Sequence, residues 1–175
     1  GPDGDDLVDY LREQGVNTER ITHTATPTGH AFIQVDHAGQ NAIIIHGGSN
    51  RVLEPHQWND CFINAQPGDW LLLQHETNAV EQIIRDAKAR DIRIAINLAP
   101  TDETVQQLPI ELTDVLIVNE VEAMALSGKS SPDVAFGVLS DKYSDTTIVM
   151  TLGKAGLLYT VRTSNASKQG ALGAF

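Results

Sequence analysis

Apolar residues recur along this chain with two different periods, and each period predicts a different kind of element. Leu7, Val8 and Leu11 form one stripe behind an acidic start, which predicts a helix that ends at Gly15. Residues 30–46 contain two β-rich runs on either side of a polar turn at 36–40. These runs predict an antiparallel hairpin.

From residue 70 onward, short apolar runs alternate with helical patterns. The predicted helices cover residues 80–87, 120–126 and 132–143, the last with Ser131 as N-cap and Pro132 in its first turn. The predicted strands are Trp70–Leu73, Ile92–Ile96, Val115–Val118, Thr147–Met150 and a fifth, antiparallel one at Leu157–Val161. Strand-helix alternation predicts an α/β fold, a mostly parallel, doubly wound, Rossmann-like sheet with helices on both faces and the hairpin as a projecting lid.

This organisation divides the chain into three parts. Residues 1–29 would form an N-terminal helix and connection that belong to the core, residues 30–50 the lid, and residues 51–175 the α/β core.

Composition and net charge exclude several classes of protein. The 175 residues are 41% hydrophobic and 20% charged, which suits one domain with a real core. The net charge of −11 disfavours a nucleic-acid partner, which needs a basic surface. The single cysteine, Cys61, predicts a cytoplasmic location, and no apolar run is long enough to predict a membrane span.

Polar residues follow each of the four parallel-type strands. They are Gln74-His75-Glu76, Asn97, Asn119-Glu120 and Thr151-Leu152-Gly153. Ligands bind outside the carboxyl ends of the strands in open parallel sheets, so we expect these segments to converge on one site. The alternative is that they are polar simply because loops are polar.

Two of these segments carry candidate chemistry. Thr151–Gly156 has two glycines three residues apart, which would let backbone amides approach a phosphate, with Lys154 adding charge; such a turn is also common without a ligand. Asn119 and Glu122 share one helix face, and the carboxylate would suit a water-coordinated Mg²⁺. Alternatively, Glu120 and Glu122 only favour the helix dipole.

Three other patterns carry no function. Gly128-Lys129-Ser130 follows a helix and lacks the first glycine of a P-loop. Asn165 begins a glycosylation sequon that a cytoplasmic protein would not use. The six histidines show no zinc-type clustering and are expected mostly in loops or on the surface, at His23, His30, His37, His46, His56 and His75.

The order of these segments resembles the ribokinases of the PfkB carbohydrate kinase family, from Gly1 to about Tyr159. Six short motifs carry the resemblance: Pro27-Thr28-Gly29, His46-Gly47-Gly48-Ser49-Asn50, Leu72-Leu73-Gln74-His75-Glu76, Asn97-Leu98-Ala99-Pro100, Asn119-Glu120-Val121-Glu122 and Thr151-Leu152-Gly153-Lys154-Ala155-Gly156. The Gln-x-Glu and Asn-x-Ala-Pro pair is most similar to ribokinases.

The resemblance implies a role for each matching residue. Glu76 would contact the sugar, Asn119 and Glu122 would organise Mg²⁺ and the phosphates, and residues 151–156, including Thr151, Gly153, Lys154 and Gly156, would bind the nucleotide. The hairpin would close over the sugar and form a homodimer clasp. The reaction would transfer the γ-phosphoryl group of ATP to a primary hydroxyl of a sugar such as D-ribose, and the complete enzyme could use a monovalent cation.

The sequence also departs from the family pattern. The first strand with its sugar-binding Asp, the Gly-Gly-Lys-Gly-x-Asn segment and the adenine and monovalent-cation loops are not present, and Gly173 stands where the catalytic Asp is expected. We therefore expect an incomplete sugar kinase without useful activity. The alternative is a non-catalytic module that binds a nucleotide, a sugar or a partner chain. A nicotinamide oxidoreductase ranks third because no Gly-x-Gly-x-x-Gly follows a strand.

Overall fold

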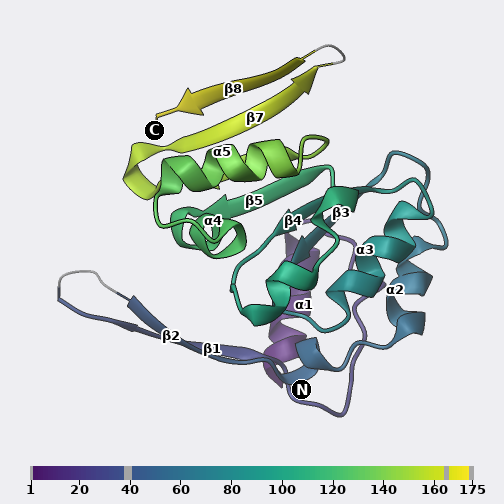
Figure 1. The fold of residues 1–175 in the computed structure, drawn as a ribbon. Helices are drawn as coiled ribbons and strands as arrows, with labels where there is room; N and C mark the ends of the chain where they lie inside the picture. The colour runs from purple at the N-terminus through teal and green to yellow at the C-terminus, as the bar shows by residue number, and fades with distance from the viewer. Residues whose placement is uncertain (1, 38–40, 164–165, 174–175) are drawn as a thin grey trace. The chain divides into compact units, whose positions relative to one another are not determined.

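A six-stranded sheet forms the centre of one of two compact units, which consists of residues 65–75 and the chain from residue 79 onward. The computed structural model describes residues 2–37, 41–163 and 166–173. The strands follow the order of the sequence across the sheet (Figure 1): β3 (Trp70–Gln74), β4 (Arg93–Asn97), β5 (Val115–Asn119), β6 (Thr147–Thr151), β7 (Leu157–Thr163) and β8 (Ala166–Leu172).

The first four strands of this sheet are parallel, and the last two are antiparallel. The predicted mostly parallel α/β sheet is thereby confirmed, including the antiparallel strand near residues 157–161. Strand β8 was not predicted; it pairs with β7 along its whole length, from Leu157 opposite Leu172 to Thr163 opposite Ala166.

Three helices accompany the parallel strands. They are α3 (Val80–Lys88), α4 (Glu120–Ser127) and α5 (Pro132–Lys142), and short 3-10 turns lie at Glu103–Gln107, Ile110–Leu112 and Gly153–Ala155. Helices α4 and α5 pack side by side (Figure 1). Helix α5 begins with Pro132 as predicted, but the Ser131 side chain makes no capping hydrogen bond.

One face of the sheet holds the core. The register places six fully buried side chains on that face: Ile94, Ile96, Leu116, Val118, Ile148 and Met150. The opposite face is more open, and Leu72 on β3 is 72% exposed there. Because β3 to β6 follow the sequence order, right-handed crossovers place the helices of this unit on one face of the sheet. The mostly parallel sheet is as predicted, but the expectation of helices on both faces does not hold among the described residues of this unit.

The other compact unit consists of residues 1–64 together with 76–78. Its helices are α1 (Pro2–Glu13) and α2 (Pro55–Phe62), and a 3-10 turn covers Gly48–Arg51. Helix α1 confirms the prediction. Helix α2 was missed, although Pro55 occupies its first turn and the Glu54 N–H donates to Gln57 Oε1 at 2.8 Å, two features typical of a helix start.

The predicted hairpin is confirmed as strands β1 (His30–Val35) and β2 (Asn41–His46) of this unit. Phe32 pairs with Ile44 and Ile33 with Ile43, so the side chains of each pair share a face. Both faces are exposed, and Phe32, Ile33 and Ile44 each expose about 60% of their surface. A two-stranded ribbon with apolar residues on both faces is marginal in water by itself.

Candidate functional site at the carboxyl ends of the parallel strands

Each of the four parallel strands ends in a polar side chain, and the register places all four on one face of the sheet. Gln74 is opposite Asn97 across β3 and β4, and Asn119 is opposite Thr151 across β5 and β6. Because side chains alternate along a strand, these four point to the open face, whereas Ile96 and Leu116 point to the core. Within this unit, the strand ends of the four polar segments therefore lie along one edge of the sheet, as expected, while their convergence on one binding site stays a prediction.

Asn119 and Glu122 form a reciprocal cap at the start of α4. The Glu122 N–H donates to Asn119 Oδ1 at 2.9 Å, while the Asn119 N–H and its side-chain amide donate to the two carboxylate oxygens at 2.8 Å each. Glu122 is buried, and its carboxylate meets no cationic side chain among the residues that the structure describes. A buried carboxylate without a cation is costly, so its environment suits a positive ligand.

The turn after β6 uses its two glycines differently. Gly153 has a φ of 54°, a left-handed conformation, and a side chain added there would meet no atom within 4 Å. Gly156 has a φ of 98°, and an added Cβ would collide with the Leu172 carbonyl oxygen of β8. Gly153 therefore borders open space, where a ligand has room, whereas Gly156 allows two stretches of backbone to approach.

Glu76 begins the short segment 76–78, which belongs to the unit of the hairpin. Asn78 fastens this segment to the stretch after the hairpin: its amide donates to the Leu53 carbonyl at 2.9 Å, and its side-chain oxygen accepts from the Leu53 N–H at 2.9 Å. The Asn78 N–H also donates to the Asn50 carbonyl at 3.2 Å. Within this unit, Glu76 is thus tied to the end of the His46–Asn50 motif.

His75 is buried, unlike the other five histidines, which are all exposed. Its Nδ1 lies 3.0 Å from the Pro100 carbonyl oxygen, and its Nε2 lies 3.2 Å from Thr104 Oγ1. The expectation that the histidines lie mostly in loops or on the surface holds, and His75 is distinguished by being buried in the turn that follows β3. Its position inside the Gln-x-Glu motif was the signal that could have singled it out.

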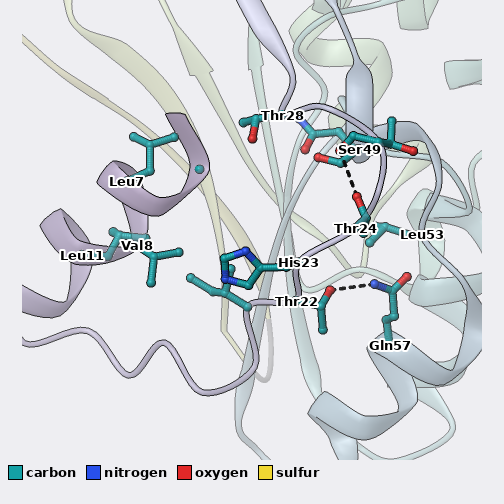
Figure 2. A pocket seen from close by; sticks show the side chains of 14 residues that line it. Leu7, Val8, Leu11, Thr22, His23, Thr24, Thr28, Ser49, Leu53 and Gln57 are labelled. Atoms are coloured by element: carbon teal, nitrogen blue, oxygen red, sulfur yellow. Dashed lines mark hydrogen bonds between the residues drawn. The ribbon is translucent and has the colours of Figure 1, made fainter. Parts of the chain in front are cut away.

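A cavity of about 320 Å³ lies in the unit of the hairpin and was not anticipated from the sequence (Figure 2). Leu7, Val8 and Leu11 of α1 line one side, and the segment of residues 21–28, rich in threonine, lines the other. Gln57 of α2 donates to Thr22 Oγ1 at 2.8 Å at its border. The cavity contains none of the predicted site residues, although its lining includes parts of two motifs, Thr28 and Ser49-Asn50.

Comparison with known proteins decides the family. The model of the pfkB family carbohydrate kinases matches residues 1–170. The chain belongs to the PfkB carbohydrate kinase family. It is similar to the ribokinase of Staphylococcus aureus (strain COL), with 32% identity over 176 residues that cover 93% of this chain and 56% of that protein.

Solved PfkB-family structures support the fold. The ribokinase of Thermotoga maritima has a TM-score of 0.73 and 26% identity, covering 98% of this chain and 56% of that one. The ribokinase of Cryptococcus neoformans, solved in complex with ADP, has a TM-score of 0.82 and 23% identity, covering 99% and 59%. The chain thus spans little more than half the length of these PfkB relatives.

Two further sequence predictions concern metals and the catalytic base of this PfkB chain. Within residues 2–37, 41–163 and 166–173, no three His, Cys, Asp or Glu side chains gather to hold a metal ion, which leaves a water-coordinated ion at Glu122 as a prediction. Gly173 directly follows β8. The three residues before it, Gly170–Leu172, form the end of that strand. No helix in the same ranges is long and apolar enough to cross a bilayer.

Proposed function

We propose that this chain supplies the nucleotide-phosphate and sugar contacts of an ATP-dependent sugar kinase that acts on a primary hydroxyl of a ribose-like sugar. One observation carries the proposal: Asn119 and Thr151, which begin the two phosphate motifs, are register partners at the carboxyl ends of adjacent parallel strands. That edge is where parallel α/β sheets bind their ligands. Ribokinase relatives support the choice of sugar.

The nucleotide phosphates would bind over residues 151–156. The open space at Gly153 would admit an oxygen close to the backbone, and the exposed Lys154 would add a positive charge. Gly156 keeps the turn compact by allowing β8 to approach it. The side chain of Thr151 donates to the Val118 carbonyl at 3.4 Å, which ties the turn to β5.

Mg²⁺ would be held through water near Glu122. Both carboxylate oxygens already accept a bond from Asn119, and each keeps a second lone pair for a metal-bound water. When bound, the ion would neutralise charge on the transferring phosphoryl group. The chain's own contribution is to hold Glu122 rigidly through Asn119, at a helix start that also favours anions.

Glu76 would contact the sugar, because it matches the sugar-binding carboxylate of ribokinases. The bonds of Asn78 to Asn50 and Leu53 fasten the segment that carries it. The hairpin would close over the sugar and pair with a second copy, through the face that consists of Ala31, Ile33, Val35, Ile43 and Ile45. A cytoplasmic location fits this substrate.

We further propose that the 175-residue chain by itself transfers the phosphoryl group slowly. Gly173, at the position expected for the catalytic Asp, has no side chain to accept the hydroxyl proton, and such a base contributes about 10²- to 10⁴-fold. A coupled ADP-release assay with ribose and Mg-ATP tests this. Ribose-dependent turnover on the order of 1 to 100 per second would contradict it.

The alternative is a non-catalytic PfkB module that binds ligands or a partner chain. Titration calorimetry tests whether the chain binds the two ligands at all. Binding of both Mg-ADP and ribose is expected of a kinase and of a ligand-binding module alike, whereas binding of neither would refute the kinase proposal.

A further inference from the structure

The contacts of His75 link two neighbouring strand ends. His75 directly follows β3, and both of its ring partners, Pro100 and Thr104, lie in the connection that follows β4. The carbonyl oxygen of Pro100 carries no proton, so the Nδ1–H of His75 is the donor in that bond. The imidazole thus bridges the end of β3 to residues 100–104 across a sequence separation of more than 20 residues.

Asp102 completes this cluster. Its Oδ1 accepts from the Thr104 N–H at 2.8 Å and from the Thr104 hydroxyl at 2.6 Å, and it lies 4.0 Å from His75 Nε2. The single hydroxyl proton of Thr104 can be donated to Asp102 Oδ1 or to His75 Nε2, so the hydroxyl is the donor in one of these two bonds at a time. The connection is also anchored at Leu98, which is fully buried and donates its N–H to the Ile117 carbonyl at 3.2 Å.

Two polar residues at the ends of β3 and β4 lie next to this bridge. His75 separates Gln74, the register partner of Asn97, from Glu76. Asn97 begins the bridged connection, and its side chain accepts from the Ala99 N–H at 3.1 Å. A shift of the connection would therefore move Asn97 and the end of β3, because both are joined to it through the chain and through His75.

We propose that His75 is a positioning residue for the sugar: its two ring nitrogens hold the connection of residues 97–104 against the end of β3 and thereby fix Gln74 and Asn97, two strand-end side chains that would contact the sugar. This inference rests on the proposed sugar-kinase function. A residue that only filled the core would be replaceable by leucine, whereas the imidazole sets a distance through hydrogen bonds. The residues proposed for the nucleotide and the metal lie at the ends of the other two parallel strands, at residues 119–122 and 151–156.

The experiment compares three variants by calorimetry with ribose and with Mg-ADP. His75→Leu fills the space without hydrogen bonds, and His75→Asn places an amide donor where Nδ1 lies. His56→Leu is the control, because His56 is exposed and outside the proposed site. Loss of a residue that only orients binding groups lowers affinity or activity by about ten- to a hundredfold at metal sites, and we take the same scale for the sugar. We expect His75→Leu to raise the Kd for ribose by that amount, with an unchanged Kd for Mg-ADP and partial rescue in His75→Asn.

Several outcomes would overturn the inference. It fails if His75→Leu binds ribose as the wild type does, or if it loses ribose and Mg-ADP equally while remaining folded. If His75→Leu does not fold, Thr104→Val replaces it, since Thr104 is exposed and its hydroxyl is the partner of Nε2. Unchanged ribose affinity in Thr104→Val, together with unchanged affinity in His75→Asn, would then refute the positioning role.

Hydrogen exchange separates this inference from the proposed function. If the wild type binds no ribose, the sugar-kinase proposal fails. The amide exchange rates of residues 98–104 then still test whether His75 holds this connection in place. We expect these amides to exchange faster in His75→Leu, with no change along β6. Unchanged exchange of residues 98–104 would show that the connection does not depend on His75.

Discussion

The carboxylate of Glu122 accepts hydrogen bonds from both the backbone N–H and the side-chain amide of Asn119, each at 2.8 Å. These bonds close the start of α4 directly at the carboxyl end of β5. The same pair thus caps helix α4 and, in our proposal, also helps to bind the metal ion and the phosphates. Both roles can be separated by measurement.

Replacing Glu122 with glutamine should lower the free energy of unfolding by about 1 to 2 kcal/mol, because the new NH₂ group faces the donors of Asn119. The mutation should also weaken binding of Mg-ADP. Glu120→Gln is the control, since Glu120 is exposed in the same helical turn. Urea denaturation and calorimetry measure the two effects. Equal losses in both variants would mean that only the helix dipole matters.

The two glycines of the nucleotide turn should respond differently to alanine. Gly156→Ala should destabilise the protein by more than about 2 kcal/mol, because its Cβ would collide with the Leu172 carbonyl. Gly153→Ala should cost only about 1 to 2 kcal/mol for the left-handed backbone. Its added methyl group should nevertheless weaken binding of Mg-ADP. The order of stabilities in urea would be reversed if Gly156 did not approach β8.

The buried side chain of Thr160 on β7 forms a hydrogen bond with the backbone of β6, and its contribution to stability can be tested. Its buried hydroxyl oxygen accepts from the Ile148 N–H at 2.8 Å. Thr160→Val keeps the shape but leaves that N–H without a partner, which costs about 1 to 3 kcal/mol. Thr160→Ser keeps the hydroxyl and should lose clearly less. Comparable urea midpoints for the two variants would contradict this assignment.

The hairpin should mediate self-association through the face that contains Ile33 and Ile43. Ile33→Lys should convert a dimer into a monomer, because it places a charge in an apolar contact. Gln34→Lys, on the opposite face of the same strand, is the matched control and should remain dimeric. Analytical ultracentrifugation decides between them. A wild type that stays monomeric at high concentration would exclude the dimer.

Much of the fold was predictable because its strands are short apolar runs. Leu116 and Val118 on β5, and Ile148 and Met150 on β6, all point into the core, and such runs are typical of buried parallel strands. Strand β8 lacks this signal, since its sequence is Ala-Ser-Lys-Gln-Gly-Ala-Leu. Its conformation depends on pairing with β7, where an added Cβ on Gly170 would lie 2.5 Å from the Tyr159 ring.

The candidate site was predictable only in part. The strand-end rule correctly grouped Asn97, Asn119 and Thr151, because parallel strands end at one edge. It could not reveal that the carboxylate of Glu122 accepts hydrogen bonds from Asn119. A capping box and a metal-binding motif both place the two residues three apart in the sequence. The strand-end rule also missed the bridge of His75, which depends on contacts between residues 25 or more apart in the sequence.

An NMR titration of the isotope-labelled 175-residue chain, first with Mg-ADP and then with ribose, tests most directly whether the strand ends bind both substrates. We predict amide shift changes at residues 119–122 and 151–156 with Mg-ADP, and at residues 74–78 and 97 with ribose. The cavity lined by Leu7, Val8 and Leu11 serves as the internal control. Shift changes confined to that cavity, or none with either ligand, would contradict the account.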